Sequence, residues 1–273
     1  MKRGVRLVAA LCFGATLAGG CDTLLPHRED ITSPEAGDRG RALVQRAVSA
    51  HGGRAAWDRL EDITFTALFE PAPAAKAGEV EPAQTEREIR FTFNFKHDRG
   101  RMDFPAEPGS AWVRNGDQVF FLQKGKLGDR PPDPESLRVP IEAQLFSMPF
   151  RMLDPGIDLA YAGLKPFDGH ERATVLVNPP PRATGMHRRS LAYFDPETGN
   201  LVHVSFDVGQ DDVGLAGDAT YLEWQQIGDL TLPKRLHVVT GRPTKVQAYD
   251  LSFVDVNLKP RVNPKIFEKP LAP

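Results

Sequence analysis

The chain has 273 residues, of which 41% are hydrophobic and 26% charged, and its 34 Lys and Arg side chains are nearly balanced by 36 Asp and Glu. This balance includes no basic patch of the kind that binds nucleic acid, so we expect no nucleic-acid partner. The length suits one large domain or two small ones.

The N-terminus has the layout of a secretory signal peptide, which we assign to residues 1–20. Three cations among the first six residues precede an apolar run from Leu7 to Leu17, and three small residues follow, ending at Gly20. The apolar run is too short for a membrane-spanning helix, which takes about 20 residues. No later segment is long and apolar enough either, so we expect no membrane-spanning helix in the mature chain.

Cys21 stands where this leader ends. The stretch resembles a bacterial lipoprotein signal, in which a small residue precedes a cysteine that receives diacylglycerol, although Ala18 stands where Leu is usual. Cys12 is the other cysteine and lies in the leader, and a lone cysteine is a liability in an oxidising compartment. We therefore predict lipid attachment at Cys21 and a periplasm-facing position in the cell envelope. A soluble secreted protein is the alternative.

Asp22 bears on the choice of membrane. An aspartate directly after the lipidated cysteine resembles the inner-membrane retention signal of some Gram-negative bacteria. That code varies among lineages, so the sequence leaves the inner and the outer membrane open.

Two helices are predicted after a tether. Residues 21–37 are polar and contain Pro without apolar periodicity, which indicates a flexible tether. The next stretch, ALVQRAVSAHGG, has apolar residues at helical spacing, and Gly52-Gly53 ends the predicted helix. A second, short helix around Arg54–Leu60 is expected to carry Trp57 inward.

From Asp62 onward the sequence is typical of strands, with a period of two in about eleven segments. The clearest segment runs from Glu88 to Lys96 and places Phe91, Phe93 and Phe95 on one face, opposite polar side chains. This alternation is expected of a half-buried antiparallel strand.

Turns and interruptions divide the strands. Asn115-Gly116 and residues 195–200 predict hairpin turns. Tyr249, Leu251 and Phe253 share a face, and Val254 and Val256 then break that parity, which predicts a bulge there. Residues 72–84 are rich in Ala and Pro and predict a loop, whereas residues 131–153 predict an inserted helix. Because strands and helices do not alternate, we expect an α+β fold with a single strongly curved antiparallel sheet and helices on its concave face.

Catalytic and metal-binding patterns are scarce. No histidine lies at metal-ligand spacing, and neither a nucleophile elbow nor a P-loop occurs. His203 is expected on a solvated strand face, and His51 as a cation at a helix C-terminus. The acidic stretch Asp207–Asp218 is the best candidate for calcium, but a solvated hairpin tip needs the same composition. We predict no metal, no cofactor, no catalytic residue and no enzymatic activity.

Three long phrases resemble the LolA/LolB-like superfamily of lipoprotein localisation factors. They are ALVQRAVSAHGGRAAWDRLEDITF, LAYFDPETGNLVHVSF and DLTLPKRLHVVTGRPTKVQAYDLSFVDVNLKPRVNPKIFEKP, and they span about Arg41 to Pro270. Gly228–Pro233 matches a glycine-hydrophobic hairpin motif except that Asp229 follows the glycine, and Ile266–Pro270 matches a terminal apolar-Phe-x-x-Pro phrase. The resemblance implies an uncharacterised lipoprotein relative with a half-barrel domain of about eleven strands over residues 38–273, enclosing a cavity for acyl chains or other lipid groups.

These features together predict a lipid-anchored periplasmic protein that is a monomer and binds a hydrophobic or lipidic ligand or a lipidated protein. Trafficking or sensing of lipids or lipoproteins is the corresponding role. Phe91, Phe93 and Phe95 are candidates for lining the cavity, although aromatic stripes on strands more often form packed core. If helices fill the half-barrel, the chain is instead a structural or interaction lipoprotein that docks a protein partner.

Overall fold

The computed structural model describes residues 25–71, 87–116, 118–128, 138–180, 187–210, 213–242 and 245–269. The predicted signal peptide, Cys21 and the loop predicted for residues 72–84 lie outside the described residues. In the described part, no helix has the length and apolarity needed to cross a membrane. The helices are η1 (Arg28–Asp30), α1 (Ala36–Ala50), α2 (Arg54–Asp58), α3 (Arg138–Ser147), η3 (Phe150–Leu153) and η4 (Pro264–Phe267).

A single open antiparallel sheet holds the thirteen strands of the described chain, in the order β6-β5-β4-β3-β2-β1-β13-β12-β11-β10-β9-β8-β7. The prediction of one curved antiparallel sheet is confirmed. The strands are β1 (Asp62–Pro71), β2 (Arg87–Asn94), β3 (Arg99–Asp103), β4 (Ala111–Asn115), β5 (Gln118–Gln123), β6 (Lys126–Leu127), β7 (Asp158–Phe167), β8 (His170–Asn178), β9 (His187–Phe194), β10 (Leu201–Gln210), β11 (Val213–Ile227), β12 (Leu230–Arg242) and β13 (Lys245–Asn257).

The expected number of about eleven strands is too low because the two edge strands have weak sequence signals. β6 has only two residues. β7 contains Pro166 and Gly163, which has a φ of +90°, and its register against β8 shifts between Tyr161 and Leu164. An edge strand tolerates proline and a bulge, which interrupt the alternation that marks a strand in sequence.

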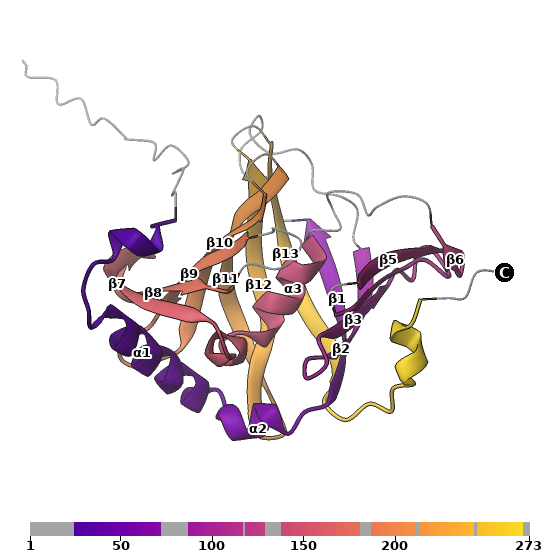
Figure 1. Ribbon diagram of the computed structural model, residues 1–273, viewed down its shortest axis with the longest axis horizontal. Coiled ribbons are helices and arrows are strands. Elements are labelled where there is room, and N and C mark those ends of the chain that lie inside the picture. The colour runs from indigo at the N-terminus through magenta and orange to yellow at the C-terminus, as the bar shows by residue number, and fades with distance from the viewer. Residues whose placement is uncertain are drawn as a thin grey trace, which may run out of the picture.

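The sheet curls so that its two ends lie on opposite sides of α3 (Figure 1). Strands β1 to β6 form one wing, strands β7 to β10 form the other, and β11 to β13 lie between them. We call these the β1–β6 wing and the β7–β10 wing. The first and last strands of the sequence, β1 and β13, pair in the interior of the sheet.

Aromatic packing fixes α3 between the wings. The ring of Phe146 on α3 lies 4.0 Å from that of Phe65 on β1 and 5.1 Å from that of Phe253 on β13, as centroid distances. The hydroxyl of Tyr221 on β11 donates a hydrogen bond of 2.9 Å to the carbonyl oxygen of Leu145. The inserted helix predicted from the sequence is therefore confirmed, and it fills much of the space between the wings.

The two N-terminal helices follow their sequence pattern. Val44, Ala47 and Val48 of α1 are fully buried, and the helix ends before Gly52, whose φ is +106°. Trp57 of α2 is 4% exposed and stacks on Phe150 at 4.7 Å between ring centroids. Both helices are thus confirmed, and α2 places an indole against η3.

The predicted tether does not run freely to residue 37. Leu25 is 7% exposed and packs with Ala36, Ala160 and Leu176 on the face of the β7–β10 wing opposite to the main core. Arg28 forms an ion pair of 2.9 Å with Asp158. The apolar surface of this wing buries Leu25, although the sequence around it is mostly polar. Residues 25–37 therefore belong with the folded domain.

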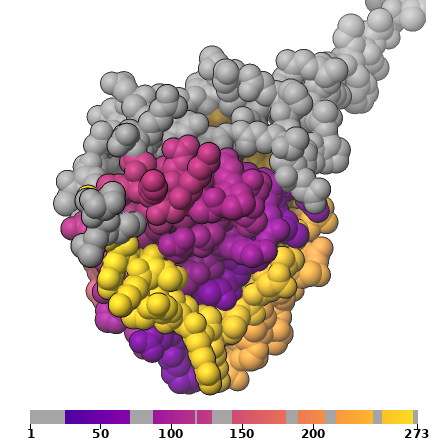
Figure 2. Space-filling model, turned by 90° about the vertical axis from the view of Figure 1, so that its right-hand side faces the viewer, coloured from indigo at the N-terminus to yellow at the C-terminus, as the bar shows by residue number. Residues whose placement is uncertain are grey.

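The C-terminal residues cover the outer face of the β1–β6 wing. Figure 2 shows this segment, in yellow, running across the surface of that wing. Phe267 of η4 is 2% exposed and packs on Ala111, Val113 and Phe120. The Arg101 guanidinium donates a hydrogen bond of 3.1 Å to the carbonyl oxygen of Ile266. The wing is therefore braced from outside and has its inner face turned to α3.

Three of the predicted local features are confirmed. Gly116 follows Asn115 in the β4–β5 turn with a φ of +60°. The Asp195 amide donates to the Asn200 carbonyl oxygen across the β9–β10 turn at 2.9 Å. The predicted bulge near Val254 appears as a register shift between β1 and β13.

Candidate ligand-binding pocket

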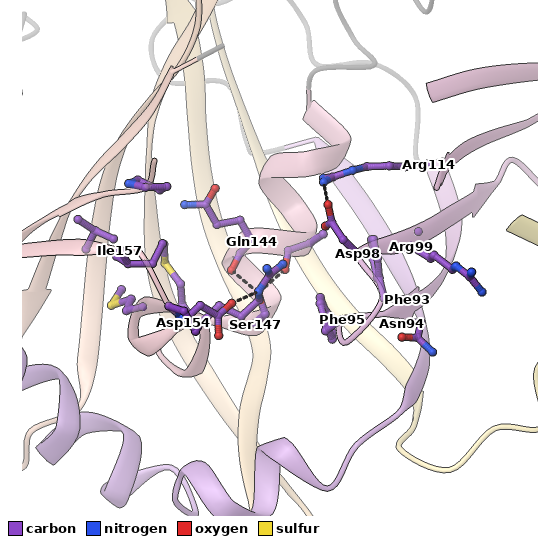
Figure 3. Close-up of a pocket in the computed structure, with 18 of the residues that line it drawn as sticks. Phe93, Asn94, Phe95, Asp98, Arg99, Arg114, Gln144, Ser147, Asp154 and Ile157 are labelled. Carbon is purple, nitrogen blue, oxygen red and sulfur yellow. Dashed lines mark hydrogen bonds and ion pairs between the residues drawn. The ribbon is translucent and has the colours of Figure 1, made fainter. Parts of the chain in front are cut away.

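A cavity of about 280 Å³ lies between the two wings, beside α3 and η3 (Figure 3). Figure 3 shows Ile157 and Gln144 on one side of it and Phe95 and Asp98 on the other. Residues of β2, β3 and β4 therefore face residues that lead into β7 and follow β8. The larger apolar side chains of the lining are Phe93, Phe95, Met102, Trp112, Met148 and Met152.

The aromatic stripe predicted on β2 divides between core and pocket. Phe91 is 1% exposed and stacks on Phe65 at 4.9 Å, so it belongs to the packed core. Phe93 and Phe95 line the cavity, and their ring centroids lie 5.4 Å apart. Phe95 follows the last residue of β2 and also contacts Trp57, at 5.2 Å. Two of the three candidate residues are thus placed at the pocket.

Methionine is concentrated at this cavity. Of the five methionines in the sequence, Met102 on β3, Met148 after α3 and Met152 on η3 all line it. Their flexible thioether chains adapt to differently shaped apolar partners. No sequence pattern indicates this cluster, because its members come from a strand, a helix end and a 3-10 helix that only the fold brings together.

Arg114 is a charged residue on the inner face of the sheet. It lies two residues after Trp112 on β4, so both side chains point to the pocket side, and it pairs with Gly100 across the strands. Its side chain is 14% exposed and forms an ion pair with Asp98, and its Nε donates to the carbonyl oxygen of Gly116 at 3.1 Å. The sequence AWVRN of β4 contains a signal for this arrangement, because strand alternation puts Arg114 on the same face as the apolar Trp112.

A second set of charges lies on the α2 and η3 side of the pocket. The Arg151 Nε donates to one carboxylate oxygen of Asp154 at 2.7 Å, and Arg54 donates to the other at 3.0 Å. Arg54 also pairs with Asp58 at 2.7 Å and donates to the Phe150 carbonyl oxygen at 3.0 Å. This network holds α2 against η3, whose Arg151 and Met152 line the cavity.

His51 is not the cationic helix cap expected from the sequence. Its side chain is 1% exposed and lies 4.1 Å from the Trp224 ring, with neither ring nitrogen hydrogen-bonded in the described part of the chain. Burial lowers the pKa of His51 from 6.5 to about 4, because the charged imidazolium is poorly solvated there. The residue is therefore neutral near pH 7 and packs as an apolar ring at the end of α1.

His203 is also buried, contrary to the expectation of a solvated ring. It is 7% exposed, stacks on Phe167 at 4.2 Å, and contacts Asp218 through Nε2 at 3.2 Å. Burial acts to raise the pKa of Asp218, but hydrogen bonds from His203 and Ser205 outweigh it and hold that pKa below its ordinary value. Both faces of β10 are covered at this point, which alternation alone does not reveal.

Acidic residues do not gather into a metal-binding group in the described part of the chain. Of the stretch considered for calcium, Asp207 pairs with Arg189 at 3.1 Å and Asp218 with His203. Asp211 and Asp212 lie outside the described residues. The described carboxylates of this stretch are thus committed to protein partners.

Comparisons with known proteins identify the fold. No family model matches the chain, and no curated protein matches it in sequence. Among solved structures, a DUF1329 family protein from Desulfovibrio piger is similar over 84% of this chain and 97% of its own, with a TM-score of 0.50 and 14% identity.

Two further solved structures give the same result. A domain from Vibrio parahaemolyticus, provisionally described as an outer membrane lipoprotein-sorting protein, covers 85% of this chain and 97% of its own, with a TM-score of 0.52 and 12% identity. A LolA superfamily protein from Nitrosomonas europaea covers 84% and 97%, with a TM-score of 0.50 and 12% identity. The protein thus has a LolA-like fold, as the resemblance of its sequence implies.

Proposed function

We propose that this protein holds a hydrophobic or lipidic ligand in the pocket between the wings, as a lipid-anchored protein that faces the periplasm. The observation that carries the proposal is the cavity of about 280 Å³, whose wall is formed by aromatic and methionine side chains from the β1–β6 wing and from the segment of α3 and η3. Ligand pockets are concave, mostly apolar and supplied with a few polar groups, and this one combines those properties.

Two other observations support the same role. The Vibrio parahaemolyticus domain with this fold is provisionally described as a lipoprotein-sorting protein, which fits a ligand that is a lipid or a lipidated protein. The pattern around Cys21 fits a lipid anchor at the start of the mature chain. Transport or sensing of lipids or lipoproteins in the bacterial envelope would use both features.

We also propose that the protein is not an enzyme. The acidic side chains that line the pocket, Asp98 and Asp154, accept from Arg114 and from Arg151 and Arg54. A carboxyl group that acts as a general acid or base must exchange its proton with a substrate, and ion pairing with arginine opposes that exchange. Positioning a ligand is the task that these charges suit better.

A second candidate function follows from the filled part of the half-barrel. Phe146 packs directly between Phe65 and Phe253, so α3 occupies space that a larger ligand would need. A packed half-barrel would serve as a scaffold whose outer surface docks a protein partner. The small cavity distinguishes the two candidate functions, because only the ligand-binding function requires that a ligand occupy the cavity.

Binding of N-phenylnaphthylamine, an uncharged apolar dye that brightens in apolar surroundings, tests the first candidate. We expect saturable binding that Ala143→Phe abolishes, because Ala143 lines the cavity and is 8% exposed. Ala42→Phe, at an exposed position of α1, is the matched control and should bind normally. Absence of saturable binding, together with native mass spectra that show no retained ligand, would favour the docking scaffold.

A further inference from the structure

We infer that the pocket takes a single-chain amphiphile whose head is an oxyanion, such as a fatty carboxylate, and that Trp112 and Arg114 receive this head. The inference rests on the proposed function and names the class of its ligand. Its starting point is an unsatisfied donor in the pocket wall.

The indole nitrogen of Trp112 lacks an acceptor. Its Nε1 is buried without a hydrogen-bond partner in the described part of the chain, and the residue is only 8% exposed. Five described residues have a buried side-chain nitrogen or oxygen atom without a hydrogen-bond partner. Of these five, Trp112 is the one that lines the cavity. A buried N–H without a partner is costly, so a ligand that brings an acceptor to it gains affinity.

Arg114 adds positive charge beside this donor. It follows Trp112 by two residues on β4, so the two side chains share the inner face. Its Nε and one of its terminal nitrogens donate to Gly116 and Asp98, and the other terminal nitrogen has no partner among the described residues. One guanidinium NH2 group therefore remains to donate to a ligand.

The charged side chains of the lining leave Arg114 as the place for the head group. Three arginines, Arg99, Arg114 and Arg151, line the cavity with two aspartates, Asp98 and Asp154. Asp154 pairs with both Arg151 and Arg54, and Arg54 also pairs with Asp58, so the charges of this group balance. Figure 3 shows Arg99 directed away from Gln144 and Ile157, and its Nε donates to Asn115 at 3.1 Å. The head group therefore belongs near Arg114.

Head chemistry and volume together select the ligand class. A neutral carbonyl offers one oxygen to Trp112, whereas a carboxylate or phosphate has oxygens for both Trp112 and the unpartnered nitrogen of Arg114 and forms stronger hydrogen bonds. The cavity of about 280 Å³ is slightly smaller than the usual range for small-molecule pockets, about 300–1,000 Å³. One acyl chain fits this space better than the two of an ordinary membrane phospholipid.

Calorimetric titration of the purified chain with monomeric dodecanoate, dodecyl phosphate, dodecanol and dodecyltrimethylammonium tests the head group. We expect the two anions to bind about tenfold more tightly than dodecanol, and the cation to bind most weakly. The preference between carboxylate and phosphate identifies the source of the oxyanion. Equal affinity for dodecanoate and dodecanol would overturn the inference and leave the proposed function intact, whereas failure of all four to bind would overturn both.

A short-chain diacyl phosphatidate tests the number of chains, and its binding more tightly than dodecyl phosphate would overturn that part of the inference. Trp112→Phe removes the N–H and keeps an aromatic ring, so it should weaken dodecanoate about tenfold and leave dodecanol unchanged. Arg114→Gln should do the same. Trp224→Phe and Arg90→Gln, at residues outside the lining, are the matched controls. Unchanged dodecanoate affinity in Trp112→Phe would remove Trp112 from the head site.

Discussion

The guanidinium carbon of Arg151 lies 5.3 Å from the centroid of the Phe95 ring, and this contact joins η3 to the turn after β2. Both residues line the pocket, so the contact crosses from one of its sides to the other. A cation over an aromatic face at an exposed site contributes about 0.5–1 kcal/mol. Such a weak contact can close the cavity without preventing a ligand from leaving it.

Replacing Arg151 should therefore change the kinetics of ligand exchange more than the stability of the fold. We expect Arg151→Gln to release N-phenylnaphthylamine faster in stopped-flow fluorescence and to lower the free energy of unfolding by about 1–2 kcal/mol, because the ion pair with Asp154 is lost together with the ring contact. Arg151→Lys retains a cation and serves as the control. A release rate in Arg151→Gln equal to that of the wild-type chain would show that the contact does not restrict exchange.

Two phenylalanines should separate binding from stability. Phe146→Ala should lower the free energy of unfolding by about 3–5 kcal/mol, because the ring is fully buried against Phe65 and Phe253. Phe95→Ala should weaken dye binding with a smaller loss of stability, because this ring borders the cavity. Urea denaturation and dye titration of both variants measure the two effects. Equal losses of stability would contradict the assignment of Phe95 to the pocket wall.

His51 should make the protein less stable in mild acid. Its pKa is about 4 in the folded chain, below the ordinary value of 6.5, so between these values the unfolded chain binds a proton that the folded chain does not. Stability from this residue is complete above about pH 6.5 and falls by about 3 kcal/mol as the pH drops to about 4.

Urea denaturation at pH 7 and pH 5 measures this effect. The free energy of unfolding should differ less between the two pH values in His51→Leu than in the wild-type chain, because the contribution of His51 is removed. The matched control is His97→Leu, at an exposed ring. An undiminished pH dependence in His51→Leu would mean that other groups cause it.

The glycine pair after α1 offers a matched test of close packing. A Cβ at Gly52 would lie 2.0 Å from the carbonyl oxygen of Asp229, whereas a Cβ at Gly53 would meet nothing within 4 Å. Both residues have positive φ, so each alanine substitution strains the backbone by roughly 1–3 kcal/mol. Gly52→Ala should be distinctly the more destabilising in urea denaturation, and similar losses would argue against tight contact between α1 and the β11–β12 hairpin.

The lipid anchor is tested at Cys21. We expect Cys21→Ser to abolish incorporation of a clickable fatty acid and to release the protein from the membrane fraction, since this cysteine is the proposed attachment site. Asp22→Ser, in contrast, should retain the fatty-acid label, so that it tests only whether Asp22 directs the protein to one of the two membranes. Labelled Cys21→Ser protein would contradict the assignment, and an unchanged membrane distribution of Asp22→Ser would mean that Asp22 is not a sorting signal.

Alternation and turn chemistry predict most of this fold from the sequence. The hairpin turn at Asn115-Gly116 and the stripe on β2 depend on neighbouring residues, so they are visible locally. The strand β7 is not, because Gly163 and Pro166 interrupt its pattern and only an edge position makes them acceptable.

The candidate pocket is predicted less completely than the fold. Alternation selects the face of Phe93 and Phe95, but it does not separate them from Phe91, because helix packing decides which rings are covered. Met102, Met148 and Met152 are far apart in sequence and meet only through tertiary structure. The burial of His51 and His203 is missed for the same reason, since other elements supply the rings that cover them.

The open edges of the sheet determine how far the protein can accommodate a bulky guest. Among the strands that the structure describes, β6 and β7 are the two ends of the order and do not pair with one another, so no backbone hydrogen bonds between these two strands join the wings. A closed barrel can widen only by breaking such bonds or changing its shear. Here the wings can move apart when the twisted sheet flexes and side chains separate. The cavity volume available to a ligand can therefore increase without the loss of backbone hydrogen bonds.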